Sequence, residues 1–172
     1  MKTALVMELE RLELAEAKLA ELQKMRVHLA PEAVQRIAGL VKLRGIGGTG
    51  ALALSTQLFW RQFDNRRQVG ACVGMVGVPY DSGTMRQDQG ISKAGDPKVR
   101  ALLIELAWLW LRYQPDSAIT RWFARRTQGS GPRGKRVMIV AVARRLAIAL
   151  WRYLAQGVVP EGARFKPTWV TV

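Results

Sequence analysis

Histidine and cysteine are nearly absent from this sequence, and their scarcity excludes several kinds of site. The 172 residues include one cysteine, Cys72, so an internal disulfide framework and a zinc site built on cysteines are both excluded. The one histidine, His28, lies near the N-terminal end. A hydrolase that uses a Ser-His-Asp triad would therefore have no imidazole in the rest of the chain.

Long apolar runs are also absent. Residues 1–30 alternate acids and bases and lack the apolar centre of a secretory signal. The longest apolar stretch, Val99–Leu111, is interrupted by Arg100 and Glu105. It is much shorter than the roughly 20 residues that a membrane-spanning helix needs. We therefore expect a cytoplasmic protein with no membrane partner.

Negative charge is scarce in most of the chain. Lys and Arg total 27 against 13 Asp and Glu, which gives a net charge of +14. Residues 1–40 carry six basic and six acidic side chains, whereas residues 41–172 carry 21 basic and seven acidic ones. The whole excess of positive charge thus follows a neutral N-terminal arm. Such a basic region indicates a polyanionic partner, with nucleic acid first and an anionic membrane surface second.

The N-terminal arm, residues 1–30, has the pattern of a coiled-coil or linker helix. Leu5, Leu12 and Leu19 recur every seven residues, and a second apolar set falls three positions after the heptad a positions: Ala15, Leu22 and Leu29. This seam predicts a homodimer or higher oligomer that pairs through residues 5–29. A single amphipathic helix lying on its own core would show a similar pattern, and both interpretations stay open.

Helix-start and helix-stop signals predict a mainly α-helical fold for residues 31–156, followed by an extended tail over 157–172. Asp96 followed by Pro97 is a strong helix start, because an N-cap residue precedes a proline at the first helical position. The helix that follows is apolar nearly all round, so we expect it to be central and buried. We expect a loop with a small hairpin over 75–95, a flexible loop over 129–134, and helices over 31–43, 49–60, 66–74, 97–113, 117–127 and 135–154.

The segment Leu43-x-Gly45-Ile46-Gly47 resembles the turn of a helix-hairpin-helix motif. Its glycines allow a tight turn, so the amides at the start of the next helix would face a phosphate. Lys42 and Arg44 would add positive charge there. These observations make Lys42, Arg44, Gly45 and Gly47 candidate contacts to DNA or RNA. A plain tight turn between two packed helices is the alternative.

A serine beside a glycine, in Tyr80-Asp81-Ser82-Gly83, is the candidate nucleophile. The residues that follow include a cluster of four cationic side chains: Arg86, Lys93, Lys98 and Arg100. A hydroxyl among cations suits attack on a phosphodiester, because the cations would stabilise negative charge in the transition state. A serine beside glycine is also common in ordinary loops, so residue chemistry alone leaves both interpretations open.

The order of these motifs resembles the C-terminal transposase domain of bridge-RNA-guided insertion-sequence transposases. The resemblance runs from about Ala38 to Ala163. It rests on segments in one order: Leu43-x-Gly45-Ile46-Gly47, Tyr80-x-Ser82-Gly83, Gly90-Ile91-Ser92-Lys93-x-Gly95, Arg100-x-Leu102-Leu103, Ala107-Trp108, Trp122-Phe123 and Ala141-x-Ala143-Arg144. Several spaced motifs in one order are more specific than any single motif.

This resemblance implies a function and partners. Members of that family have an RNase-H/RuvC-like domain with four metal-binding acids, then a coiled coil, then this domain, whose serine forms a covalent phosphoserine link to cleaved DNA. That role would fall to Ser82. Lys93 and Arg100 match the motif for nucleic-acid contacts, and Lys98 is added from its position. The implied partners are DNA and a structured guide RNA, in a bacterial, nucleoid-associated setting.

The sequence departs from the family pattern at a few points. Gly77 stands where proline is common, and Asp96 stands where asparagine is common. No RuvC-like domain precedes the coiled coil, so we expect a truncated or excised part of a transposase. Mg²⁺ is expected only with that missing domain and not in this chain. Two other classes remain: a non-catalytic nucleic-acid-binding helix-hairpin-helix module, and a dimeric scaffold.

Overall fold

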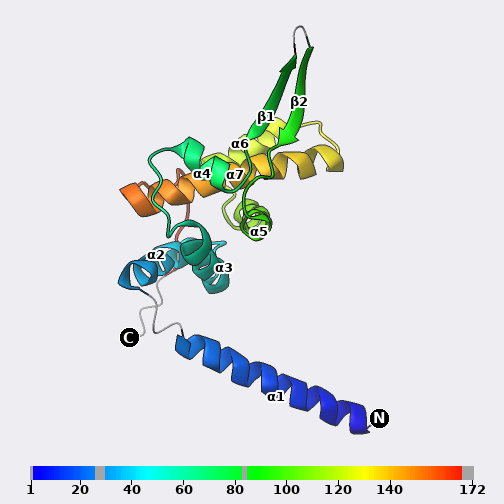
Figure 1. The fold of residues 1–172 in the computed structure, drawn as a ribbon, viewed down its shortest axis with the longest axis vertical. Coiled ribbons are helices and arrows are strands. Elements are labelled where there is room, and N and C mark those ends of the chain that lie inside the picture. The colour runs from blue at the N-terminus through cyan, green and yellow to red at the C-terminus, as the bar shows by residue number, and fades with distance from the viewer. Residues whose placement is uncertain (1, 26–29, 83–84, 168–172) are drawn as a thin grey trace. The chain divides into compact units, whose positions relative to one another are not determined.

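The computed structural model describes residues 2–25, 30–82 and 85–167. Contacts divide the chain into two compact units, Met1–Val34 and Gln35–Val172. The described residues are mainly helical, with one antiparallel pair of strands, so the prediction of a mainly α fold is confirmed (Figure 1). None of the helices in these three ranges combines the length and apolar character that crossing a bilayer requires.

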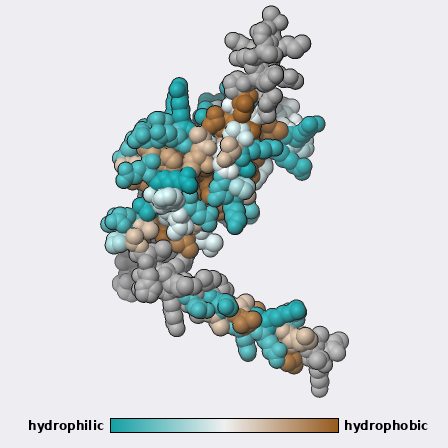
Figure 2. All heavy atoms as spheres, viewed as in Figure 1, coloured by the Kyte–Doolittle hydropathy of each residue, from teal (hydrophilic) through white to brown (hydrophobic). Residues whose placement is uncertain are grey.

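The first unit contains helix α1 (Lys2–Met25), where the sequence predicted a helix. Several apolar side chains on it are exposed: Val6, Met7, Leu9, Leu12 and Leu14. Brown and teal atoms accordingly alternate along the coloured part of this helix in Figure 2. Leu29, at the end of the predicted seam, lies outside the described residues. The pairing of two such helices stays a prediction.

The next elements are short. Helix α2 (Pro31–Lys42) ends before a tight turn, and α3 (Gly48–Ala53) continues directly into a π-helical segment, η2 (Leu54–Leu58). The sequence predicted continuous helix here but gave no sign of the π-helical turn. Helix α4 (Arg66–Cys72) is capped by Asn65, whose side chain accepts hydrogen bonds from the next turn's backbone.

Three longer helices surround the core. Helices α4, α5 (Pro97–Tyr113) and α6 (Ala118–Thr127) all contact α7 (Pro132–Gln156), and Figure 1 shows α5 crossing α7. The buried core includes Leu103, Trp110, Leu146 and Leu150. The indole N–H of Trp110 donates a hydrogen bond to Ser117 Oγ (2.9 Å), so its burial leaves no polar group unsatisfied.

Two details of these helices correct the sequence-based expectations. Helix α7 begins at Pro132, so half of the predicted 129–134 loop is helical; Gly131 is its N-cap and Pro132 takes the first helical position. Helix α5 is not buried all round, because the side chains of Trp108 and Leu109 are 43% and 39% exposed. An apolar residue on a helix is thus buried only where a neighbouring element covers it.

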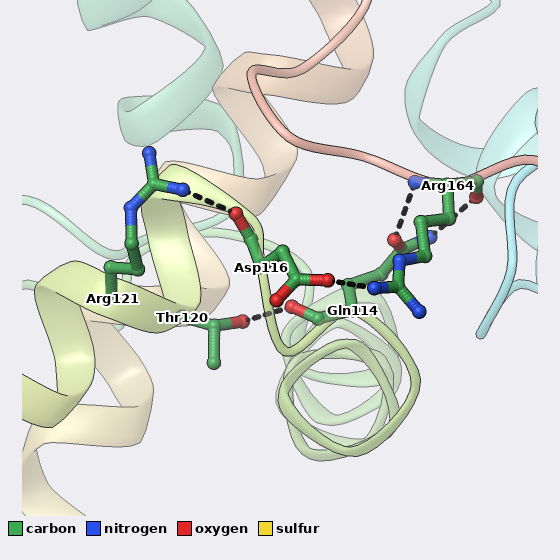
Figure 3. Close-up of polar contacts among 5 residues, drawn as sticks. All are labelled: Gln114, Asp116, Thr120, Arg121 and Arg164. Carbon is green, nitrogen blue, oxygen red and sulfur yellow. Dashed lines mark hydrogen bonds and ion pairs between the residues drawn. The ribbon is translucent and has the colours of Figure 1, made fainter.

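The segment after α7 is tied to the start of the second unit. Gln114, which is fully buried, donates from Nε2 to the carbonyls of Arg44 (2.9 Å) and Arg164 (2.8 Å) and accepts from the Arg164 amide (2.7 Å). Figure 3 shows the two contacts with Arg164. Phe165 pairs with Leu43 as an antiparallel bridge. Beside them, Asp116 forms an ion pair with Arg164. One buried amide therefore joins three segments that are distant in sequence.

Candidate nucleic-acid interface

The backbone places Ser82 at the end of the first strand of a hairpin. Strand β1 (Gly77–Ser82) pairs with β2 (Met85–Ile91), and the register sets Ser82 opposite Met85 and Asp81 opposite Arg86. Figure 1 shows the two strands extending away from α6 and α7. Gly83, the second residue of the Ser-Gly motif, lies outside the described residues. Ser82 and Arg86 thus belong to the same small sheet.

The base of this hairpin is anchored by hydrogen bonds to the segment after α4. The amide of Ser92 donates to the Val76 carbonyl (2.8 Å), and the amide of Lys93 donates to the Gly74 carbonyl (3.0 Å). Arg100, in the first turn of α5, donates from Nη1 to the carbonyls of Val73 (3.3 Å), Lys93 (3.4 Å) and Gly95 (3.4 Å). A single guanidinium therefore holds both ends of the hairpin against α5.

Gly74 and Gly95 make this close approach possible. A Cβ on Gly95 would lie 2.2 Å from the Cys72 carbonyl oxygen, and Gly74 has a left-handed φ of 66°. Lys93 also takes a left-handed conformation, with φ of 55°, which is uncommon for a residue with a side chain. Backbone packing at the hairpin base therefore explains Gly95, whereas it gives no reason for a lysine at position 93.

Two exposed cations flank this base. Lys93 and Lys98 both have exposed side chains. Lys98 lies in the first turn of α5, where its amide donates to the N-cap carboxylate of Asp96 (2.8 Å). The N-cap predicted from the sequence is therefore present. Arg100 differs from these lysines, because its Nη1 is engaged with main-chain carbonyls.

The other predicted contacts lie in the turn between α2 and α3. Gly45 has a left-handed φ of 87° and packs on α5, where an added Cβ would lie 3.3 Å from the Leu109 carbonyl oxygen. Gly47 is the N-cap of α3. Arg44, Gly45 and Gly47 line one surface hollow together with Lys166, whose Nζ donates to the Ile46 carbonyl (2.8 Å). The Lys42 carbonyl accepts from the amide of Lys166 (2.7 Å).

The predicted site residues therefore form two groups. Arg44, Gly45 and Gly47 share the α2–α3 turn with Lys42, whereas Lys93, Lys98 and Arg100 surround the base of the hairpin that carries Ser82. The hollow at the α2–α3 turn and the hydrogen bonds at the hairpin base share no predicted site residue. The described residues contain no group of three His, Cys, Asp or Glu residues that could hold a metal ion.

Comparison with known proteins identifies the family. Residues 37–122, which are half of the chain, match the transposase family named IS116/IS110/IS902. The chain belongs to this transposase family. The match begins within α2, contains the α2–α3 turn and the serine hairpin, and ends at Trp122 in α6.

Three relatives give the extent of this similarity. The chain is 49% identical over 130 residues to transposase y4rJ of Sinorhizobium fredii, which covers 75% of this chain and 33% of that protein. It is 32% identical over 151 residues to a family 20 transposase of Pseudomonas aeruginosa, and the match covers 86% of this chain and 43% of that protein. It is 32% identical over 143 residues to the IS1328 transposase of Yersinia enterocolitica, and the match covers 80% of this chain and 40% of that protein. The chain thus spans less than half the length of these transposases.

Two features of the site were not predicted from the sequence. The carbonyl contacts of Arg100 join segments that are up to 27 residues apart, and the contacts of Gln114 join segments up to 70 residues apart. A proline directly follows Gln114, which marks it in the sequence only as a helix end. Gln114 can be recognised as a link between segments only by the full burial of its side chain, and that burial exists only in the folded chain.

Proposed function

We propose that this chain is part of a DNA transposase and supplies the serine nucleophile, Ser82, for strand cleavage and transfer. Membership of the transposase family carries the proposal. The position of Ser82 at the end of β1, in a hairpin anchored beside two exposed lysines, supports it. The net charge of +14 agrees with a nucleic-acid partner.

In the proposed reaction, the Oγ atom of Ser82 attacks a DNA phosphorus. A phosphoserine bond forms, the bond from phosphorus to the leaving sugar oxygen breaks, and the leaving oxygen takes up a proton while Oγ loses one. A sugar hydroxyl of the recipient strand then attacks the phosphoserine and releases Ser82. Ser82 lies at the turn end of the hairpin and Lys93 and Lys98 lie at its base, so the lysines would contact phosphates that flank the attacked one.

The described residues do not fit a magnesium site, because they contain no cluster of three potential ligands. No step is therefore assigned to a metal bound by this chain. The relatives are more than twice as long as the matched region. We propose that full activity requires the remainder of such a transposase, in the same chain or in a partner chain.

A covalent adduct between protein and DNA tests the role of Ser82. A complete transposase containing this domain is incubated with labelled target DNA and resolved under denaturing conditions. We expect an adduct with the native protein and with Ser92→Ala, whose side chain is exposed in the neighbouring motif, but none with Ser82→Ala. An adduct that persists in Ser82→Ala would show that another residue is the nucleophile.

We also propose two partners: a structured guide RNA and a second copy of the chain. The RNA rests on the motif resemblance together with the basic composition. The second copy would pair through residues 5–29, and the exposed Leu12 on α1 supports this. Light scattering of the chain with and without residues 1–29 tests the pairing; an unchanged number of subunits would contradict it.

A non-catalytic binding module is the second candidate function. One observation favours it: two helices flank a turn in which Gly45 takes a left-handed conformation, as the helix-hairpin-helix motif requires. In that case the native chain would bind nucleic acid in a strongly salt-dependent manner. The complete protein would then form no covalent adduct with DNA.

A further inference from the structure

A groove lined by arginines lies between α4, α6 and α7, away from the serine hairpin in the sequence. Its volume is about 530 Å³, and its lining includes five arginines and one tryptophan: Arg66, Arg67, Trp122, Arg144, Arg145 and Arg152. The remaining lining is aliphatic, with Ile119 and Ile148 among it. No acidic residue lines the groove. The five arginines of this lining are called the groove arginines below.

The groove arginines lack carboxylate partners. In residues 35–82 and 85–167 the ion pairs join Arg121 to Glu161 and Arg164 to Asp116, and neither pair includes a groove arginine. Five like charges held together repel one another, which raises the free energy of the empty groove. A bound polyanion would remove that repulsion.

The side chain of Arg144 carries a hydrogen-bond donor that has no partner in the described structure. Its Nε is buried and has no hydrogen-bond partner within the described structure. The side chain lies over Gly70 of α4, where an added Cβ would be 2.9 Å from Nε. Any larger residue at position 70 would displace the guanidinium. The Nε atom itself is covered, so a ligand in the groove would contact the guanidinium through its other nitrogens.

Arg145 is held by an aromatic ring. Its guanidinium lies 3.9 Å from the ring centroid of Trp122. Burial, and secondarily the positive charge of Arg126, lower the pKa of Arg145 from its ordinary value. The guanidinium covers one face of Trp122, which leaves less of the ring for stacking with a base. The arrangement therefore favours contacts to phosphate over contacts to unpaired bases.

We propose that the groove binds the sugar–phosphate backbone of duplex DNA. The proposal deepens the proposed function and rests on it, because the family moves DNA. Arginine suits this role, since its planar guanidinium can donate two parallel hydrogen bonds to one phosphate. The groove is separate from the candidate contacts at the α2–α3 turn and the hairpin base, and it draws on three helices. It would position DNA, whereas Ser82 would cleave it.

The test compares two double variants of the 172-residue chain. Arg66→Gln/Arg152→Gln removes two groove charges, and Arg112→Gln/Arg133→Gln removes two exposed charges that do not line the groove. Both variants lose two units of net charge. Binding to a labelled random-sequence DNA duplex is measured by fluorescence anisotropy at several salt concentrations, with the same sequence as single-stranded RNA in a parallel series. Circular dichroism confirms that each variant is folded.

We expect the groove variant to bind duplex DNA about tenfold to a hundredfold more weakly than the native chain near 0.1 M salt. Its slope of log affinity against log salt should fall by about 1.8, because each lost phosphate contact contributes about 0.9. The control variant should lose less than half as much.

A third variant removes no charge. Gly70→Ala should displace Arg144 and weaken DNA binding severalfold while the net charge stays at +14. This result would separate the position of the guanidinium from the overall charge. A folded Gly70→Ala chain with native affinity would contradict the role assigned to Arg144.

Three results would overturn the proposal. Equal losses in the groove and control variants would mean that charge acts without a defined site. Losses confined to RNA would assign the groove to RNA. Failure of the native chain to bind the duplex would exclude a DNA site in this chain. These tests measure equilibrium binding of DNA, whereas the Ser82 experiment measures a covalent adduct. A failure of the groove proposal can therefore be distinguished from a failure of the proposed function.

Discussion

Two sets of polar side chains in this domain have similar chemistry and different surroundings. Arg100, Gln114 and Arg121 donate hydrogen bonds to main-chain carbonyls and are called the clamp residues. The groove arginines, by contrast, form no ion pair in the described part of the chain. The clamp residues thus hold segments of this chain together, whereas the groove arginines are proposed to bind a ligand.

The difference shows that residue type does not decide role in a basic protein. Arg100 and Arg144 are both half-buried arginines. Arg100 points to three carbonyls of the hairpin base, and Arg144 leaves a buried Nε without a partner. Replacing a clamp residue should reduce stability, and replacing a groove arginine should reduce binding. The following predictions test this separation, in order of decreasing effect on stability.

The largest loss of stability is expected for Gln114→Leu. The change removes three hydrogen bonds and leaves the part-buried Arg44 carbonyl and Arg164 amide without these partners, whereas the Arg164 carbonyl keeps its bond from the Arg44 amide (3.1 Å). Each unpaired group raises the free energy of the folded state by roughly 1–3 kcal/mol, so a total of about 3–5 kcal/mol is expected. Urea unfolding measures it. Gln62→Leu, at an exposed position, serves as the control and should change little.

A smaller loss is expected for Arg100→Gln. The shorter side chain cannot reach the carbonyls of Val73, Lys93 and Gly95 together, and we expect a loss of about 1–3 kcal/mol. Arg112→Gln, on the same helix but exposed, should stay within about 0.5 kcal/mol of the native chain. If the two variants unfold at the same urea concentration, Arg100 is not a clamp.

Arg121→Gln should have a still smaller effect. Arg121 donates to the Asp116 carbonyl (2.6 Å) and pairs with Glu161 (2.8 Å), but both side chains of the ion pair are more than half exposed. Exposed ion pairs contribute roughly 0–1 kcal/mol, so the unfolding free energy should fall by about that amount. High salt should reduce the difference between variant and native chain. A larger loss would mean that Arg121 belongs with Gln114.

The smallest effect on stability is expected for Arg66→Gln/Arg152→Gln. Both side chains are exposed, so the unfolding free energy should stay within about 0.5 kcal/mol of the native value, or rise as repulsion is relieved. Urea unfolding of the same preparations used for DNA binding checks this. A loss as large as that of Arg100→Gln would break the distinction between clamp and groove.

Much of the fold could be predicted from local signals. Asp96 and Pro97 predicted the start of α5, and Ser117 caps α6 where its helix was expected. The errors fall where local signals compete. Gly131 and Gly134 suggested a loop, but Pro132 starts α7 between them because proline is favoured at the first helical position. The π-helical segment Leu54–Leu58 left no recognisable pattern.

The candidate site could be predicted only in part. Motif order proposed Ser82 and the glycines of the α2–α3 turn as site residues, and the left-handed backbone at Gly45 explains why glycine stands there. The partners of Arg100 could not be predicted, since they are carbonyls that every residue carries. The groove as a whole could not be predicted either: the seven-residue spacing of Arg145 and Arg152 indicates one exposed helix face, but Arg66 lies on a helix distant in sequence and joins them only after folding.

The most direct test of the central claim is to locate the residue that becomes linked to DNA. A complete transposase carrying this domain is trapped on target DNA, digested with nuclease and trypsin, and its modified peptide is sequenced by mass spectrometry. We predict the nucleotide on Ser82, within the peptide from Gln68 to Arg86. A nucleotide on Tyr80 or on any peptide elsewhere in the protein would contradict the claim.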